Sequence, residues 1–254
     1  MREFLRVVLV AGLSFVTVTG RAQSVAVAPA PADAAKQIAA MQIKLDDWPQ
    51  LGRYRAENVA LVPAALGVER VVFYGDSITD SWGRQPETGE FFPGKPYVNR
   101  GISGQTTPQM VVRFRQDVID LHPAAVLILA GTNDVAGNTG QMTPEMTEDN
   151  FKSMIDLAKA NGILVIVASI TPVADYPWRP GLGPAQKIQT LNAWLQEYCL
   201  NHSVTYLDYY SALVDDKGGM KAGTSFDGMH PNAKGYAIMT PLAQAAIDKT
   251  LGGK

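Results

Sequence analysis

Short apolar runs alternate along this chain with longer amphipathic stretches, and this alternation constrains the fold more than any other feature. A short run rich in Val, Ile and Leu fits a strand that is buried on both faces, and an amphipathic stretch between two runs fits a crossover helix. These patterns predict an α/β fold in which parallel strands are joined by helices. The predicted strands lie at residues 70–74, 97–99, 125–130, 163–169 and 204–207.

The stretches between these runs carry recognisable helix ends. Thr107 is the predicted N-cap of the first crossover helix, with Pro108 at its first position. A second helix is predicted from Thr143 to Asn161, because Gly162 permits a left-handed stop. Two further helices are expected over residues 184–198 and 232–251. Their inner faces are predicted to bury Ile188, Leu191, Leu195 and Tyr198 in one helix and Tyr236, Met239, Ala243 and Ile247 in the other.

Residues 1–22 have the pattern of a cleavable signal peptide, with Arg2 and Arg6 ahead of an apolar run and small residues before a cut after Ala22. Residues 23–32 are rich in Ala, Val and Pro and predict a flexible tether. The sequence therefore predicts a secreted or periplasmic protein. An uncleaved anchor is the alternative, but the apolar run is short for a bilayer. No cysteine lies near the cut, so a lipid anchor is not expected.

Residues 33–254 are predicted to form a single domain, since no internal linker or repeat divides them. The domain begins with a helical extension, residues 33–65, outside the alternating pattern. Within it we expect a helix at 35–46 and a second segment at 48–61. The second segment carries four apolar side chains that we expect to pack against the main body, namely Trp48, Leu51, Tyr54 and Val59.

Composition excludes some classes of function. The formal net charge is -2, and loss of residues 1–22, which hold three arginines and one glutamate, makes it -4. Basic residues are scattered and form no stripe, so nucleic acid is not an expected partner. No stable membrane insertion of the mature chain is expected either. Cys199 is the only cysteine and cannot form an internal disulfide, so we expect it to be buried as a small apolar residue.

Polar residues of unusual kinds follow four of the five predicted strands. Ligands bind at the carboxyl ends of parallel strands, so these residues are the candidates for a site. The segments are Gly-Asp-Ser-Ile-Thr-Asp around Ser77, Arg-Gly-Ile-Ser-Gly ending at Gly104, Gly-Thr-Asn-Asp around Asn133, and Asp-Gly-Met-His-Pro from Asp227 through His230. Together they predict one site built from distant parts of the chain.

These residue types suit acyl transfer, which needs a nucleophile, a base, a group that orients the base, and donors for an oxyanion. Ser77 sits at a strand-to-helix turn and is the predicted nucleophile. His230 is the predicted base, and Asp227, three residues earlier, can hold its ring. The backbone N–H of Gly104 and the amide of Asn133 are the predicted oxyanion donors, together with the N–H of Ser77. The other two histidines, His122 and His202, lie in surface connectors.

Each motif alone also fits a structural role. A serine in such a turn is commonly an N-cap, and an Asn or an Asp-x-x-His commonly decorates a loop. Their placement after successive strands is what favours the catalytic interpretation. No cofactor and no metal is expected, because zinc sites gather several ligands and a single histidine lies near the site. The Gly-x-Ser-x-Gly elbow of another hydrolase fold is absent around Ser77.

At these four segments the chain resembles the GDSL family of esterases and lipases, also called SGNH hydrolases. The resemblance covers about residues 66–242. It implies a flavodoxin-like three-layer α/β/α sandwich with a five-stranded parallel sheet. It also implies that Ser77 is the nucleophile, that Ser77, Gly104 and Asn133 form the oxyanion hole, that Asp227 and His230 complete a triad, and that no cofactor is needed.

The sequence constrains the substrate less than it constrains the fold or the reaction. The loop after the fourth strand places Tyr176, Trp178 and Arg179 between prolines, a set that can stack on a sugar and bind its hydroxyls. Together with Asp76, beside Ser77, they are candidate substrate contacts. We therefore expect hydrolysis of short acyl esters on a carbohydrate, that is, of a small-molecule or oligosaccharide ester. Three alternatives remain. Both rings could pack onto the sheet edge, the acyl chains could be longer, as in lysophospholipases or thioesterases, or the protein could be a sugar-binding module without turnover.

Overall fold

The computed structural model describes residues 32–63 and 67–252, and the chain divides into two units, residues 1–42 and 43–254. Helix α1 (Ala32–Asp46) begins in the first unit. The predicted signal peptide and the predicted tether up to residue 31 lie outside the described residues. In the described ranges, no helix combines the length and the apolar character needed to cross a membrane.

The second unit is built on a parallel sheet with the strand order β2-β1-β3-β4-β5. Each strand lies within two residues of a predicted run at both ends, and every neighbouring pair is parallel. The predicted fold class is therefore confirmed. The strands are β1 (Val71–Gly75), β2 (Tyr97–Gly101), β3 (Ala125–Leu129), β4 (Leu164–Ala168) and β5 (Thr205–Leu207).

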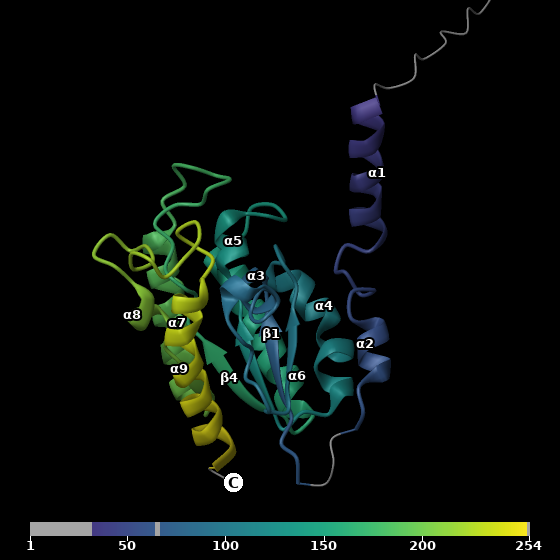
Figure 1. Cartoon of the computed structure of the whole chain (residues 1–254), viewed down its shortest axis with the longest axis vertical. Helices are drawn as coiled ribbons and strands as arrows, with labels where there is room; N and C mark the ends of the chain where they lie inside the picture. Colours follow the sequence, from purple (N-terminus) through teal and green to yellow (C-terminus); the bar gives the residue numbers. More distant parts are fainter. Residues whose placement is uncertain (1–31, 64–66, 253–254) are drawn as a thin grey trace, which may run out of the picture. The chain divides into compact units, whose positions relative to one another are not determined.

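Helices cover both faces of this sheet, and successive side chains of one strand point to opposite faces. Val72 and Tyr74 of β1 pack among apolar side chains of α4 (Thr107–Asp117), α6 (Pro144–Ala160) and α7 (Ala185–Asn201). Val71 and Phe73 pack on the other side against α9 (Ala233–Gly252). In Figure 1, α9 and α4 lie on opposite sides of β1. The predicted inner faces are buried, except that Tyr198 is only partly covered.

Short helices follow two neighbouring strands at one end of the sheet. α3 (Ser77–Asp80) follows β1, and α5 (Thr132–Ala136) follows β3. Figure 1 shows both at the same end of the second unit. α3 lies so close to the strands that a Cβ on Gly75 would come within 2.2 Å of Thr79 Oγ1, so glycine is required there. The remaining short elements are α2 (Arg55–Ala60), α8 (Tyr210–Leu213) and the 3₁₀ turns η1 (Pro86–Thr88) and η2 (Ile119–Leu121).

Two local predictions are corrected. The N-cap of α4 is Thr106 rather than Thr107, because Thr106 and Gln109 form a capping box in which the Thr106 N–H donates to Gln109 Oε1. In the extension, Tyr54 is buried as predicted, but Val59 is 85% exposed and Trp48 is 40% exposed. The single turn of α2 instead directs Asn58 at α4, where its amide donates to the Gln116 carbonyl at 3.0 Å.

Candidate active site

Ser77, His230 and Asp227 lie in hydrogen-bond contact at the carboxyl end of the sheet. Ser77 is the first residue of α3, and its Oγ is 3.0 Å from His230 Nε2. The other ring nitrogen, Nδ1, is 2.7 Å from Asp227 Oδ2. A carboxylate accepts a proton donor, so Nδ1 carries the hydrogen in the neutral ring and Nε2 is left to accept from the Ser77 hydroxyl.

A tight turn between β5 and α9 holds His230 and Asp227. Asp227 Oδ1 accepts the backbone N–H groups of Met229 at 3.1 Å and His230 at 2.8 Å. Burial acts to raise the pKa of Asp227, but hydrogen bonds from the His230 backbone and ring keep that pKa below its ordinary value. The carboxylate therefore stays ionised while it fixes the position of the ring.

Two backbone N–H groups are available near Ser77 Oγ. The N–H of Ser77 belongs to the first turn of α3, which the helix itself leaves unpaired. Gly104 has a φ of +78°, a left-handed conformation that favours glycine, and a Cβ at this position would meet no atom within 4 Å. The backbone of Gly104 thus borders open space, and a substrate oxygen can approach it.

Asn133 lies in the first turn of α5 with its side chain fixed at both ends. Nδ2 donates to the Gln105 carbonyl at 2.9 Å, and Oδ1 accepts Asn138 Nδ2 at 2.7 Å. These contacts assign the orientation of the amide. Nδ2 is also 3.4 Å from Asp76 Oδ2, which is long for a hydrogen bond. The second N–H of the amide therefore makes only this weak contact, and Asn133 lines the adjoining cavity.

Asp76 lies beneath the site rather than in it, which corrects the expectation that it contacts substrate. Its side chain is 1% exposed, and Oδ1 caps α3 by accepting the Ile78 N–H at 3.0 Å. Burial raises the pKa of Asp76 to about 7, although the Ile78 N–H and the charge of His230 act against that rise. The neighbouring Asp134 is buried as well, and burial raises its pKa to about 6.

A cavity of about 520 Å³ opens over Ser77. Its volume is within the range of small-molecule sites. Residues from α3, from the turns after β2 and β3, from the loop after β4 and from the turn before α9 line it. They are Ser77, Ser81, Ser103, Gly104, Asn133, Asn138, Trp178, Phe226, Asp227, Met229 and His230.

The loop after β4 contributes one of its three predicted substrate contacts to the lining of the cavity. Trp178 lines the cavity, and its Nε1 is 3.3 Å from Asn138 Oδ1. Tyr176 is 1% exposed, and its hydroxyl donates to the Thr132 carbonyl at 2.7 Å, so this ring packs inside the protein. The Arg179 guanidinium donates to the Ala136 carbonyl and does not line the cavity. The expected substrate contact by Tyr176 is therefore corrected, whereas that by the exposed Arg179 stays a prediction.

Sequence reasoning also missed residues of the cavity. Phe226 and Met229 flank Asp227 and could have been found from that position alone. Asn138 could not, because nothing near it in the sequence separates it from an ordinary surface asparagine. Its amide nevertheless joins Asn133 to Trp178.

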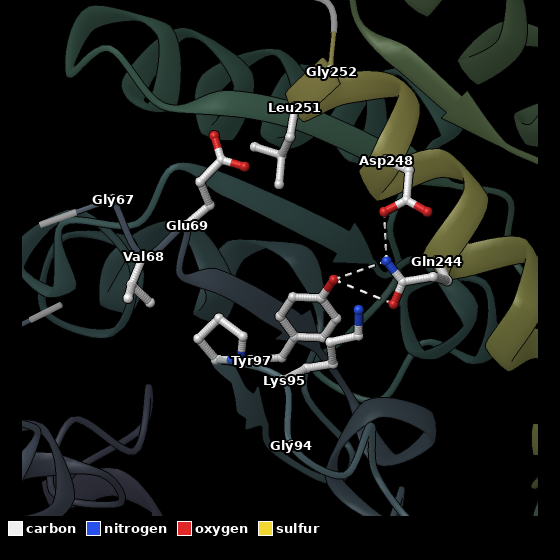
Figure 2. A pocket seen from close by; sticks show the side chains of 11 residues that line it. Gly67, Val68, Glu69, Gly94, Lys95, Tyr97, Gln244, Asp248, Leu251 and Gly252 are labelled. Atoms are coloured by element: carbon white, nitrogen blue, oxygen red, sulfur yellow. Dashed lines mark hydrogen bonds between the residues drawn. The ribbon is translucent and has the colours of Figure 1, made fainter. Parts of the chain in front are cut away.

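A hollow of about 890 Å³ lies away from this chemistry, where β2 begins and α9 ends, at the opposite end of the strands from Ser77. Figure 2 shows its hydrogen bonds, in which Gln244 Nε2 donates to the Tyr97 hydroxyl at 3.0 Å and to Asp248 Oδ1 at 2.7 Å. Its lining includes no serine, cysteine or histidine. Across the described residues, no cluster of three or more His, Cys, Asp or Glu side chains could hold a metal ion.

Comparison with known proteins gives a match over most of the second unit. Residues 73–238 match the GDSL-like lipase/acylhydrolase family. The solved structure of a GDSL-like lipase from Bacteroides thetaiotaomicron is 44% identical and covers 79% of this chain and 98% of its own, with a TM-score of 0.75. A structure from Bacteroides fragilis is 43% identical over 80% of this chain and 98% of its own, with a TM-score of 0.77.

Two curated proteins are also similar. A Bacillus subtilis protein named as an uncharacterized lipoprotein, YqeF, is 30% identical over 172 residues, which are 61% of each chain. An acetylxylan esterase from Geobacillus stearothermophilus is 36% identical over 88 residues, 26% of this chain and 40% of that protein. The chain thus spans less than two thirds of the length of either curated relative.

Proposed function

Because this chain belongs to the GDSL-like lipase/acylhydrolase family, we propose that it is a carboxylic ester hydrolase in which Ser77 is the nucleophile. The observation that carries the proposal is the pair of contacts at His230, 3.0 Å from Nε2 to Ser77 Oγ and 2.7 Å from Nδ1 to Asp227 Oδ2. A serine, a base and an orienting carboxylate in this arrangement can perform acyl transfer without a cofactor.

In the first half of the reaction, Ser77 Oγ attacks the ester carbonyl carbon while His230 Nε2 takes the hydroxyl proton. A tetrahedral intermediate forms with negative charge on the former carbonyl oxygen. When its bond to the alcohol oxygen breaks, Nε2 returns the proton to that oxygen and the alcohol leaves. The acyl group remains on Ser77 as an ester.

In the second half, a water molecule attacks the acyl-enzyme and gives its proton to His230 Nε2. Collapse of the new intermediate breaks the bond to Ser77 Oγ, which recovers the proton, and the acid is released. Asp227 stabilises the charged ring at both stages because its carboxylate remains ionised beside Nδ1.

Three donors stabilise the oxyanion in this proposal: the N–H of Ser77, the N–H of Gly104 and the second N–H of the Asn133 amide, which gives up its weak contact with Asp76. The first two are backbone groups, and the side chain of the third is held by Gln105 and Asn138, so little reorganisation is needed as charge develops. A fixed donor in a water-poor site contributes on the order of 3 kcal/mol to the barrier reduction.

We further propose that the substrate is a carbohydrate that carries a short acyl group, an acetyl, as an ester. The exposed rings of Trp178 and Phe226 on the cavity rim support this assignment, because such rings can cover the apolar face of a sugar. The similarity to a protein named acetylxylan esterase supports it as well.

The test is a comparison of rates on p-nitrophenyl esters from acetate to dodecanoate with rates on acetylated xylan. We expect a preference for acetate, activity on acetylated xylan, and loss of nearly all activity in Ser77→Ala with an intact fold. A fluorophosphonate should label the peptide that contains Ser77. A sizeable rate in Ser77→Ala would remove Ser77 from the mechanism, and a preference for dodecanoate would favour the lysophospholipase or thioesterase alternative.

We also infer export of the protein to the periplasm or the outside of the cell. The basic start, the apolar run and the small residues before residue 23 support this inference. One relative is named a lipoprotein, which is compatible with the same location. Mass spectrometry of the protein recovered outside the cytoplasm should give an N-terminus at Gln23. Recovery of the full-length chain in the membrane fraction would contradict the predicted cut.

A further inference from the structure

The active-site cavity does not end at the oxyanion donors. A second cavity of about 450 Å³ shares Ser103, Gly104 and Asn138 with it. A third, of about 370 Å³, shares Trp48 and Thr139 with the second. Because neighbouring cavities share lining residues, they adjoin one another in a row that runs from Ser77 across Gly104 to Trp48. We call this row the extended cleft.

The far wall of the extended cleft comes from residues 47–50, which precede the segment matched by the family. Three glutamine amides hold this part of the chain by its backbone carbonyls. Gln109 donates to the Trp48 carbonyl at 2.7 Å, Gln105 to the Pro49 carbonyl at 2.8 Å, and Gln116 to the Leu51 carbonyl at 2.8 Å.

Further hydrogen bonds fix the backbone that follows the wall. Asp47 accepts the backbone N–H groups of Leu51 at 2.7 Å and Gly52 at 2.8 Å. Tyr54 is fully buried and donates to the Gly101 carbonyl at the end of β2. These contacts fix the backbone on both sides of Trp48, so that the side chain is presented to the cleft with little left to order on binding.

Gln105 connects this wall to the oxyanion donors. Its side chain is completely buried, with Nε2 on Pro49 and Oε1 accepting Arg113 Nε. Its own carbonyl accepts Asn133 Nδ2 at 2.9 Å. A single residue therefore contacts both the wall and the group that is proposed to bind the oxyanion.

We propose that residues 47–50 form a carbohydrate subsite and that Trp48 is a specificity-determining residue for oligosaccharide esters. This proposal rests on the proposed function. The acetylated sugar lies over Ser77 next to Trp178, and the saccharide chain continues across Gly104 towards Trp48.

The chemistry of the wall fits such a chain. The Trp48 side chain is 40% exposed although the backbone beneath it is fixed, and a flat indole face can cover the apolar C–H face of a sugar ring. Gln50 lines the same cavity, and an amide can exchange hydrogen bonds with ring hydroxyls. A monosaccharide ester occupies only the cavity over Ser77, so the subsite adds affinity only for longer chains.

The test uses monoacetylated xylose, xylobiose, xylotriose and xylotetraose with the full chain. We expect kcat/KM of the wild type to rise at least tenfold from the shortest to the longest substrate. Trp48→Ala and Trp48→Leu should remove at least fivefold of that rise, whereas Trp48→Phe, which keeps a flat ring, should retain most of it. Trp194→Ala is the matched control, since Trp194 lies on α7 and lines none of the three cavities.

Binding supplies a readout that does not depend on turnover. In a Ser77→Ala background, calorimetry with xylotetraose should show a Kd at least fivefold weaker after Trp48→Ala. Equal kcat/KM on all four saccharides, or the same length dependence in Trp48→Ala and wild type, would overturn the subsite and leave the carbohydrate esterase intact. Hydrolysis of p-nitrophenyl acetate without hydrolysis of any acetylated saccharide would overturn the carbohydrate assignment and the subsite together, but not the esterase.

Discussion

The buried carboxyl of Asp76 makes the stability of this protein depend on pH in a direction opposite to that of an ordinary aspartate. Burial raises its pKa from 3.8 to about 7, so between these values the unfolded chain has released the proton while the folded chain retains it. Stability therefore falls as pH rises through this window and levels off above about pH 7. A displacement of roughly three units at 1.36 kcal/mol each is on the order of 4 kcal/mol.

Asp76→Asn isolates this contribution. The amide oxygen can still accept the Ile78 N–H and cap α3, but the side chain no longer titrates. Any constant effect of the substitution shifts the free energy of unfolding equally at every pH. We therefore expect the stability of the variant relative to the wild type to increase by up to about 4 kcal/mol between pH 4 and pH 8.

Urea unfolding, followed by tryptophan fluorescence at five pH values from 4 to 8, measures this difference. The buried Asp134 titrates in both proteins, so its contribution largely cancels in the comparison. A stability difference that stays constant over the whole range would show that the Asp76 carboxyl titrates alike in the folded and unfolded chains, and the reasoning would be refuted.

Three other substitutions test the site and its support. Asn133→Ala should lower kcat on p-nitrophenyl acetate about a hundredfold with little change in KM, and a rise in KM at constant kcat would instead assign Asn133 to substrate binding. Arg113→Met should reduce the free energy of unfolding by about 3 to 5 kcal/mol, because it leaves the fully buried carboxylate of Asp117 without its charge partner. A smaller loss in Arg113→Met/Asp117→Leu would support this reason. Trp178→Ala should lower the ratio of kcat/KM on an acetylated oligosaccharide to that on p-nitrophenyl acetate by roughly fivefold, and an equal loss on both substrates would indicate a structural role.

The sheet and the family were predictable because their signals are local. The central strands β1 and β3 are runs of apolar residues in which every residue is buried. Three of the four polar segments lie directly after strands and the fourth follows β5 at a distance, just before α9; parallel topology brings the segments that follow strands to one end of the sheet. Ser77 and His230 are therefore found within hydrogen-bond distance although 153 positions separate them.

The loop after β4 was less predictable because composition does not reveal which side chains point into the protein and which point out. Tyr176 and Trp178 are two positions apart, and their ring centroids lie 5.1 Å from each other. One ring is nevertheless buried and the other half exposed. The Thr132 carbonyl at the start of α5 is what separates them, since it accepts the Tyr176 hydroxyl, and its position depends on the packing of two loops.

The wall formed by residues 47–50 had no local signal, since its partners lie 56 and 61 positions away on Gln105 and Gln109. Without that segment, the amides of Gln105 and Gln109 would lose their carbonyl acceptors, and a buried donor left unpaired costs about 1 to 3 kcal/mol. Gln105 would lose the most, because its buried side chain also accepts Arg113 while its backbone holds Asn133. The segment that shapes the far end of the extended cleft is therefore also part of what keeps the proposed oxyanion donor in place, and the two cannot vary independently.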